Sequence, residues 1–91
     1  MTVPHDNSTD PYANTPTAMV YDVFAETANE LIGLCTARSD AASDPVERDT
    51  WWQRALTVRD VRRSVPAQDR QALLRHIAVW KADAEALKAA Q

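Results

Sequence analysis

The sequence predicts an all-α protein, either a small three-helix bundle or a long helical hairpin with one further helix, following a disordered N-terminal tail. Apolar residues recur at spacings of three and four over three segments, which is the period of an amphipathic helix. Polar segments that contain proline separate these segments. Gly33 is the single glycine, so glycine-based hairpin turns are missing, and no stretch alternates apolar with polar residues as strands do.

The length of 91 residues predicts one domain, because a second hydrophobic core has no room to form. Residues 1–15 contain two prolines and many Asp, Asn, Ser and Thr residues without periodicity, so we expect a disordered polar tail. Residues 16–91 are expected to form a single helical domain.

The first helix is expected over residues 16–38. Thr15 followed by Pro16 is typical of an N-cap with proline at the first helical position. One side of this helix is broadly apolar. The opposite side carries acidic residues at four-residue spacing, here called the acidic ridge: Asp22, Glu26 and Glu30.

The second and third helices are expected over residues 45–63 and 66–89. Asp44, Pro45 and Glu47 have the spacing of a capping box with a first-turn proline. Pro66 disfavours helical geometry at the residue before it and separates the two helices. The apolar stripe of the third helix is narrower and consists of Leu73, Ile77, Trp80, Ala84 and Leu87.

Two adjacent tryptophans indicate that the second helix has two apolar strips. Trp51 and Trp52 lie about 100° apart on a helix, so one line of core contact cannot hold both rings equally well. Trp52 aligns with Leu56, whereas Trp51 aligns with Ala55 and Val58. Either the bundle buries a wide face of this helix, or one strip belongs to an interface with another molecule.

The interface hypothesis predicts self-association as a homodimer as the more common solution, and another protein as the other possible partner. Arginine and tryptophan, which are enriched at binding hot spots, occur together in these strips. The acidic ridge is expected to pair with arginines of the second helix, within or between chains. The predicted partner interface comprises Trp51, Trp52, Ala55, Val58, Arg59 and Arg62.

Nucleic-acid binding is the alternative function. The first 50 residues have a net charge of −7, whereas residues 51–91 have a net charge of +4. This asymmetry indicates either attraction between the two halves or a basic binding face. The arginines that cluster around the second connection, and would contact nucleic acid, are Arg54, Arg59, Arg62, Arg63, Arg70 and Arg75.

No pattern in the sequence predicts catalysis, a cofactor or a metal site. Cys35 lies on the apolar side of the first helix, His76 borders the apolar stripe of the third, and metal-ligand spacings are missing. The lone cysteine and the lack of a signal-peptide pattern or a membrane span predict a cytoplasmic protein. We therefore expect a non-enzymatic interaction module such as an adaptor, an antitoxin-like neutraliser or a regulatory accessory protein, a class with many small bacterial members.

Overall fold

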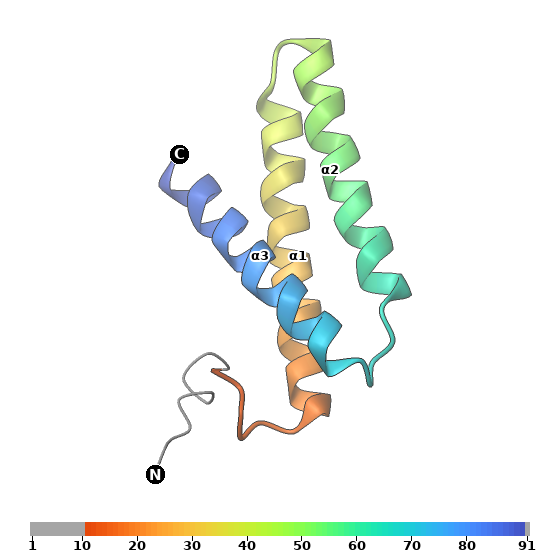
Figure 1. The fold of residues 1–91 in the computed structure, drawn as a ribbon. Helices are drawn as coiled ribbons and strands as arrows, with labels where there is room; N and C mark the ends of the chain where they lie inside the picture. The colour runs from red at the N-terminus through yellow and green to blue at the C-terminus, as the bar shows by residue number, and fades with distance from the viewer. Residues whose placement is uncertain (1–10, 91) are drawn as a thin grey trace.

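The fold consists of three helices, which the computed structural model describes over residues 11–90. They are α1 (Thr17–Ala41), α2 (Pro45–Ser64) and α3 (Arg70–Ala89), and residues 11–90 contain no strand. Helices α1 and α2 run side by side in opposite directions, and α3 lies across α1 (Figure 1). The predicted all-α class is confirmed.

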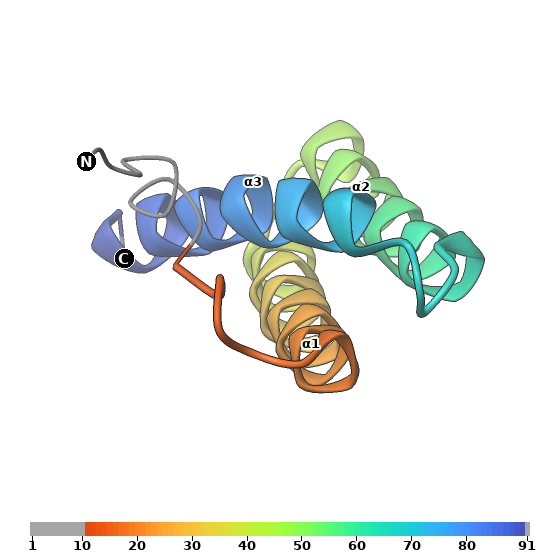
Figure 2. The same ribbon diagram turned by 60° about the horizontal axis from the view of Figure 1, so that its bottom comes forward.

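Helix α1 is the common support for the other two helices. Both α2 and α3 pack against α1, but no Cα–Cα distance within 8 Å joins α2 to α3. Figure 2 shows the two outer helices on one side of α1, diverging from the link between them. The arrangement is therefore a helical hairpin with a third helix crossing it, the second of the two predicted architectures.

The hydrophobic core lies where α1 faces both neighbours. Phe24 and Leu31 of α1 are fully buried, as is Leu73 of α3. The Phe24 ring stacks on the ring of Trp80, with centroids 5.2 Å apart. Truncation of a buried aromatic side chain of this kind costs about 3–5 kcal/mol, so the contact of α1 with α3 accounts for much of a small domain's stability.

Helix α2 begins at Pro45 as predicted, with Asp44 as its N-cap, but within the described residues no bond from the Glu47 side chain completes the predicted capping box. The side chain of Asp44 accepts a hydrogen bond from the backbone N–H of Val46 at 3.2 Å, and Pro45 occupies the first turn. A cap of this kind satisfies one of the amide groups that the first helical turn leaves without a partner.

Helix α1 differs from its prediction at both ends. Its N-cap is Pro16 and no side chain caps it, so the predicted capping role of Thr15 was wrong. The helix continues to Ala41 rather than to residue 38. The Ser39 hydroxyl is buried and donates to the carbonyl of Arg48 at 2.8 Å, which accommodates this polar residue inside the helix–helix contact.

Helix α3 begins four residues later than predicted. A turn follows Pro66, whose carbonyl accepts a hydrogen bond from the Asp69 N–H at 3.1 Å. The Asp69 side chain then accepts from the N–H of Ala72 at 3.2 Å and caps the helix. A carboxylate with a free amide in reach therefore sets this boundary, in place of the proline.

Residues 11–15, the last part of the predicted tail, have a defined local structure. They form a turn in which the Thr15 N–H donates to the Tyr12 carbonyl at 2.9 Å, and Tyr12 packs against the core. Arg70 holds this turn, donating to the carbonyl of Thr15 at 2.8 Å and to the Thr17 hydroxyl at 3.1 Å. The rest of the predicted tail, residues 1–10, lies outside the described residues.

Candidate interaction surface on helix α2

The two adjacent tryptophans of α2 have different surroundings. Trp51 is half-buried against the hydrophobic core, and the guanidinium of Arg38 lies over its ring, 5.4 Å from the centroid. Trp52 is 46% exposed and does not belong to the core cluster. The helix thus buries one indole and leaves its neighbour available to solvent.

Trp52 belongs to a line of residues along one flank of α2, outside the core cluster, here called the outer edge. Its members recur at alternating spacings of four and three, so they share one side of the helix. Leu56 is half-buried but is not packed against the core cluster. The outer edge consists of Pro45, Asp49, Trp52, Leu56, Arg59 and Arg63.

A shallow hollow of about 420 Å³ lies beside Trp52, near the turn that joins α1 to α2. Arg48 occupies one side of it and donates to the carbonyl of Ala42 at 2.8 Å. The hollow therefore offers an indole face next to two carboxylates, a surface suited to a cationic side chain with an apolar stem. Its lining residues are Ser39, Asp40, Pro45, Arg48, Asp49 and Trp52.

The structure divides the predicted partner interface between the two sides of α2. Ala55 and Val58 are each only 2% exposed in the core, so a partner cannot reach them without unfolding the helix pair. Arg62 also faces α1 and donates to the Asn29 side chain at 3.0 Å. Trp52 and Arg59 lie on the outer edge and remain the candidate contacts.

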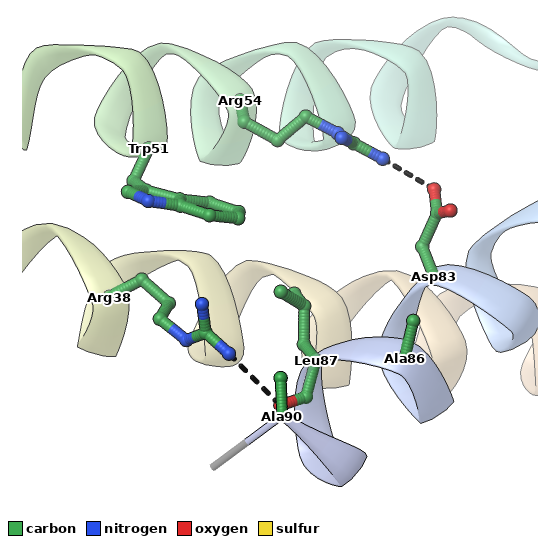
Figure 3. Close-up of a pocket in the computed structure, with 7 residues that line it drawn as sticks. All are labelled: Arg38, Trp51, Arg54, Asp83, Ala86, Leu87 and Ala90. Carbon is green, nitrogen blue, oxygen red and sulfur yellow. Dashed lines mark hydrogen bonds and ion pairs between the residues drawn. The ribbon is translucent and has the colours of Figure 1, made fainter. Parts of the chain in front are cut away.

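The open end between α2 and α3 contains a second, smaller cavity of about 180 Å³ (Figure 3). Arg54 of α2 pairs with Asp83 of α3, and Arg38 of α1 donates to the carbonyl of Leu87 at 3.1 Å. Arg38 thereby provides a hydrogen-bond donor for a carbonyl in the last turn of α3. Carbonyls in the last turn of a helix have no N–H donor within the helix itself. We interpret these contacts as a brace between helices that do not pack on each other.

The acidic ridge does not pair with α2 in the described part of the chain. Glu30 instead accepts a hydrogen bond from the Lys88 ammonium of α3 at 2.9 Å. This bond, together with the carboxylate of Glu85, raises the pKa of Lys88. Asp22 and Glu26 are exposed. Within the described chain, the ridge is therefore not paired with arginines, and pairs that include α3 occur instead: Glu30 with Lys88 and Arg54 with Asp83.

Four of the six arginines considered for nucleic-acid contact have partners within the described chain. Arg54 is paired across to α3, Arg62 bonds to α1, and Arg70 holds the turn before α1. Arg59 lies on the outer edge and contacts its neighbour Asp60 at 3.3 Å. Only Arg63 and Arg75 are exposed with no hydrogen bond or ion pair to the described residues.

The candidate chemical residues are part of the packing. Cys35 is fully buried, and this burial raises the pKa of its thiol, which further favours the unreactive protonated form. The ring of His76 lies 5.0 Å from that of Trp80. Within residues 11–90, His, Cys, Asp and Glu side chains nowhere gather in a group of three that could hold a metal ion.

Sequence reasoning found the two strips of α2 but missed Arg38 and Asp83. Their roles depend on the crossing of α3 over α1. This crossing brings Arg38 to Leu87, which is 49 positions later in the sequence, and Arg54 to Asp83, which is 29 positions later. None of the helices in the described range is long and apolar enough to cross a membrane. No family model matches the chain, and no match was found among curated proteins or solved structures.

Proposed function

We propose that this chain is a non-enzymatic protein–protein interaction module that binds its partner through the outer edge of α2. The exposure of Trp52 carries the proposal. A tryptophan that is 46% exposed, on a helix that has already supplied another tryptophan to the core, leaves apolar area without an intramolecular use.

The neighbours of Trp52 support the same interpretation. Binding hot spots combine tryptophan and arginine, and their energy is largest where the partner removes the ring from water. Arg59 lies on the same edge, and the hollow beside Trp52 provides a concave surface for a partner side chain. A module of this kind would act as an adaptor, a neutraliser or a regulatory accessory protein, and we place it in the cytoplasm.

Site-specific photo-cross-linking in cells tests this proposal. A photo-reactive phenylalanine derivative at position 56 samples the outer edge, and the same residue at position 79 samples Val79, which is 58% exposed on α3. We expect a discrete covalent adduct from position 56 and none from position 79. The adduct should disappear when Trp52→Ala is added.

Absence of any adduct from position 56, or an adduct that is unchanged by Trp52→Ala, would contradict the proposal. The mass of the adduct tells whether the partner is this chain or another protein. Both outcomes support an interaction module, so this experiment is independent of the identity of the partner.

A further inference from the structure

We infer that the outer edge of α2 binds a second copy of the same edge, with the two α2 helices antiparallel about a two-fold axis. This inference rests on the proposed function, because it names the partner for the same surface. The register of the outer edge and the distribution of charge along it support this inference.

The outer edge has the residue spacing of a two-stranded helix pair. Six positions follow one another at alternating intervals of four and three, which is the repeat of the contact line in a coiled coil. Trp52 and Leu56 form the apolar middle of this line, and charged residues flank it on both sides. Positions 45, 52 and 59 form one set, each seven residues apart, and positions 49, 56 and 63 form the other. In an antiparallel pair, each position of one set meets a position of the other set in the second copy.

One antiparallel register gives apolar contacts in the middle of the outer edge and pairs of opposite charge toward both ends. With the two-fold axis at position 54, Trp52 packs against Leu56 of the second copy. The same register places Asp49 opposite Arg59 of the second copy. Because a two-fold interface repeats every contact, each of these pairs occurs twice.

The ends of the outer edge are complementary in charge. Asp49, near the start of α2, is exposed and makes no ion pair with the described residues. Arg59, near its end, reaches only the adjacent Asp60, at 3.3 Å, and its side chain is 41% exposed. A parallel pair would place Asp49 on Asp49 and Arg59 on Arg59, and such like-charge contacts are unfavourable. The antiparallel orientation converts both into attractive pairs.

The hollow beside Trp52 has an occupant in this register. Pro45 at its rim lies opposite Arg63 of the second copy, whose guanidinium then reaches the carboxylates of Asp40 and Asp49. Arg63 is exposed and makes no ion pair within the described chain. Its apolar stem covers the Trp52 ring while its charge meets the acids. In this register, Arg63 of the second copy thus fills the hollow, and the hollow provides carboxylates for its guanidinium.

A charge-reversal experiment tests the interface and its register. Asp49→Arg makes position 49 repel Arg59 of an identical copy, and Arg59→Asp makes the reverse repulsion. We expect light scattering to find a dimer for the unmodified chain. Each variant alone should be at least about tenfold weaker in dimerisation, because like charges then meet twice. An equimolar mixture of the two variants should restore dimerisation, because both contacts become opposite in sign.

Arg75→Asp is the matched control, because Arg75 is exposed on α3 and has no place in the proposed contact. It should dimerise like the unmodified chain. If circular dichroism shows that either reversal variant is unfolded, Trp52→Glu replaces it as the test. This variant should fold, because Trp52 lies outside the core. A folded, monomeric Trp52→Glu supports the inference, and a dimeric one overturns it.

Other results would contradict the dimer or its antiparallel register. A monomer over about a hundredfold range of concentration overturns the inference. A Trp52-dependent adduct with a different protein would then leave the proposed function intact. A dimer that survives both single reversals, or a mixture that shows no recovery, refutes the antiparallel contact even if the chain self-associates.

Discussion

The inner and outer sides of α2 contain similar residues but have different surroundings. The inner side carries Trp51, Ala55 and Val58, which meet α1 and the core. The outer edge carries Trp52 and Leu56, which are not part of the core cluster. Each side has a tryptophan followed four residues later by an apolar residue, and each includes arginine. Composition therefore does not decide which side is the core. The position of α1 does.

This difference separates stability from binding along a single helix. Substitutions on the inner side remove contacts of the folded chain, whereas those on the outer edge should affect only the contacts with the proposed partner. Pairs of variants, one from each side of α2, test this separation at protein concentrations where dimerisation does not contribute.

The largest difference is expected for a buried charge. Val58→Asp places a carboxylate at a position that is 2% exposed, and an unpaired buried charge should cost about 3–5 kcal/mol of the free energy of unfolding. Leu56→Asp, two residues earlier on the outer edge, should cost about 1 kcal/mol or less. Urea unfolding followed by circular dichroism measures both. Similar losses for the two variants would mean that the outer edge is also part of the core.

Truncation of each tryptophan should give a smaller difference in the same direction. Trp51→Ala removes a half-buried ring and its contact with Arg38, so we expect a loss of about 2–3 kcal/mol. Trp52→Ala should change the free energy of unfolding by less than about 1 kcal/mol. The same unfolding measurement applies, and the order of the two variants is the result to check.

Thiol labelling reports how each side affects opening of the core. Cys35 is fully buried, and burial raises the pKa of its thiol above the ordinary value of 9.0, so a thiol reagent should react slowly with the native protein. Trp51→Ala should accelerate labelling several-fold by making opening more frequent. Trp52→Ala should leave the rate unchanged, and an equal acceleration would contradict the separation of the two sides.

The raised pKa of Cys35 also predicts a pH dependence. Above about pH 9, the unfolded chain loses the thiol proton first and binds fewer protons than the folded one, so the free energy of unfolding falls as pH rises. Below the unfolded pKa this contribution to stability is fully present. Cys35→Ala should make the decline above pH 9 shallower in urea titrations, and an identical slope in both proteins would argue against this effect.

The smallest effect is expected at the brace. Arg54 and Asp83 form an ion pair whose side chains are 44% and 36% exposed, so solvent screens it. A double-mutant cycle with Arg54→Ala and Asp83→Ala should give a coupling energy of about 0.2–1 kcal/mol. A coupling beyond about 2 kcal/mol would show that α2 and α3 depend on each other more than their separation indicates.

Local chemistry made part of the fold predictable. The period of apolar residues is sufficient to find the three helices, and the carboxylate of Asp44 next to Pro45 is a local signal that defines the start of α2. The start of α3 was predicted four residues too early, because Pro66 is compatible with both a first helical turn and a preceding turn. The amide of Ala72, bonded to Asp69, decides between them.

Tertiary contacts determine the rest. Both strips of α2 are visible in the sequence, but only the docking of α1 assigns Trp51 to the core and Trp52 to the surface. Residues 11–15 have the composition of a flexible tail, and a contact with Arg70, more than fifty residues away, gives them an ordered turn. Such long-range partners leave no periodic pattern in the sequence.

The absence of direct packing between α2 and α3 makes the domain two helix pairs that share one member. Release of α3 would expose Phe24 and its surroundings but leave the contacts between α1 and α2 in place, and release of α2 would do the reverse. Native-state amide exchange should then resolve separate opening events for the two outer helices, with the slowest exchange in the middle of α1. Dimerisation through α2 would slow one of these events more than the other, so that one arm of the domain is secured by its partner while the other stays free to open.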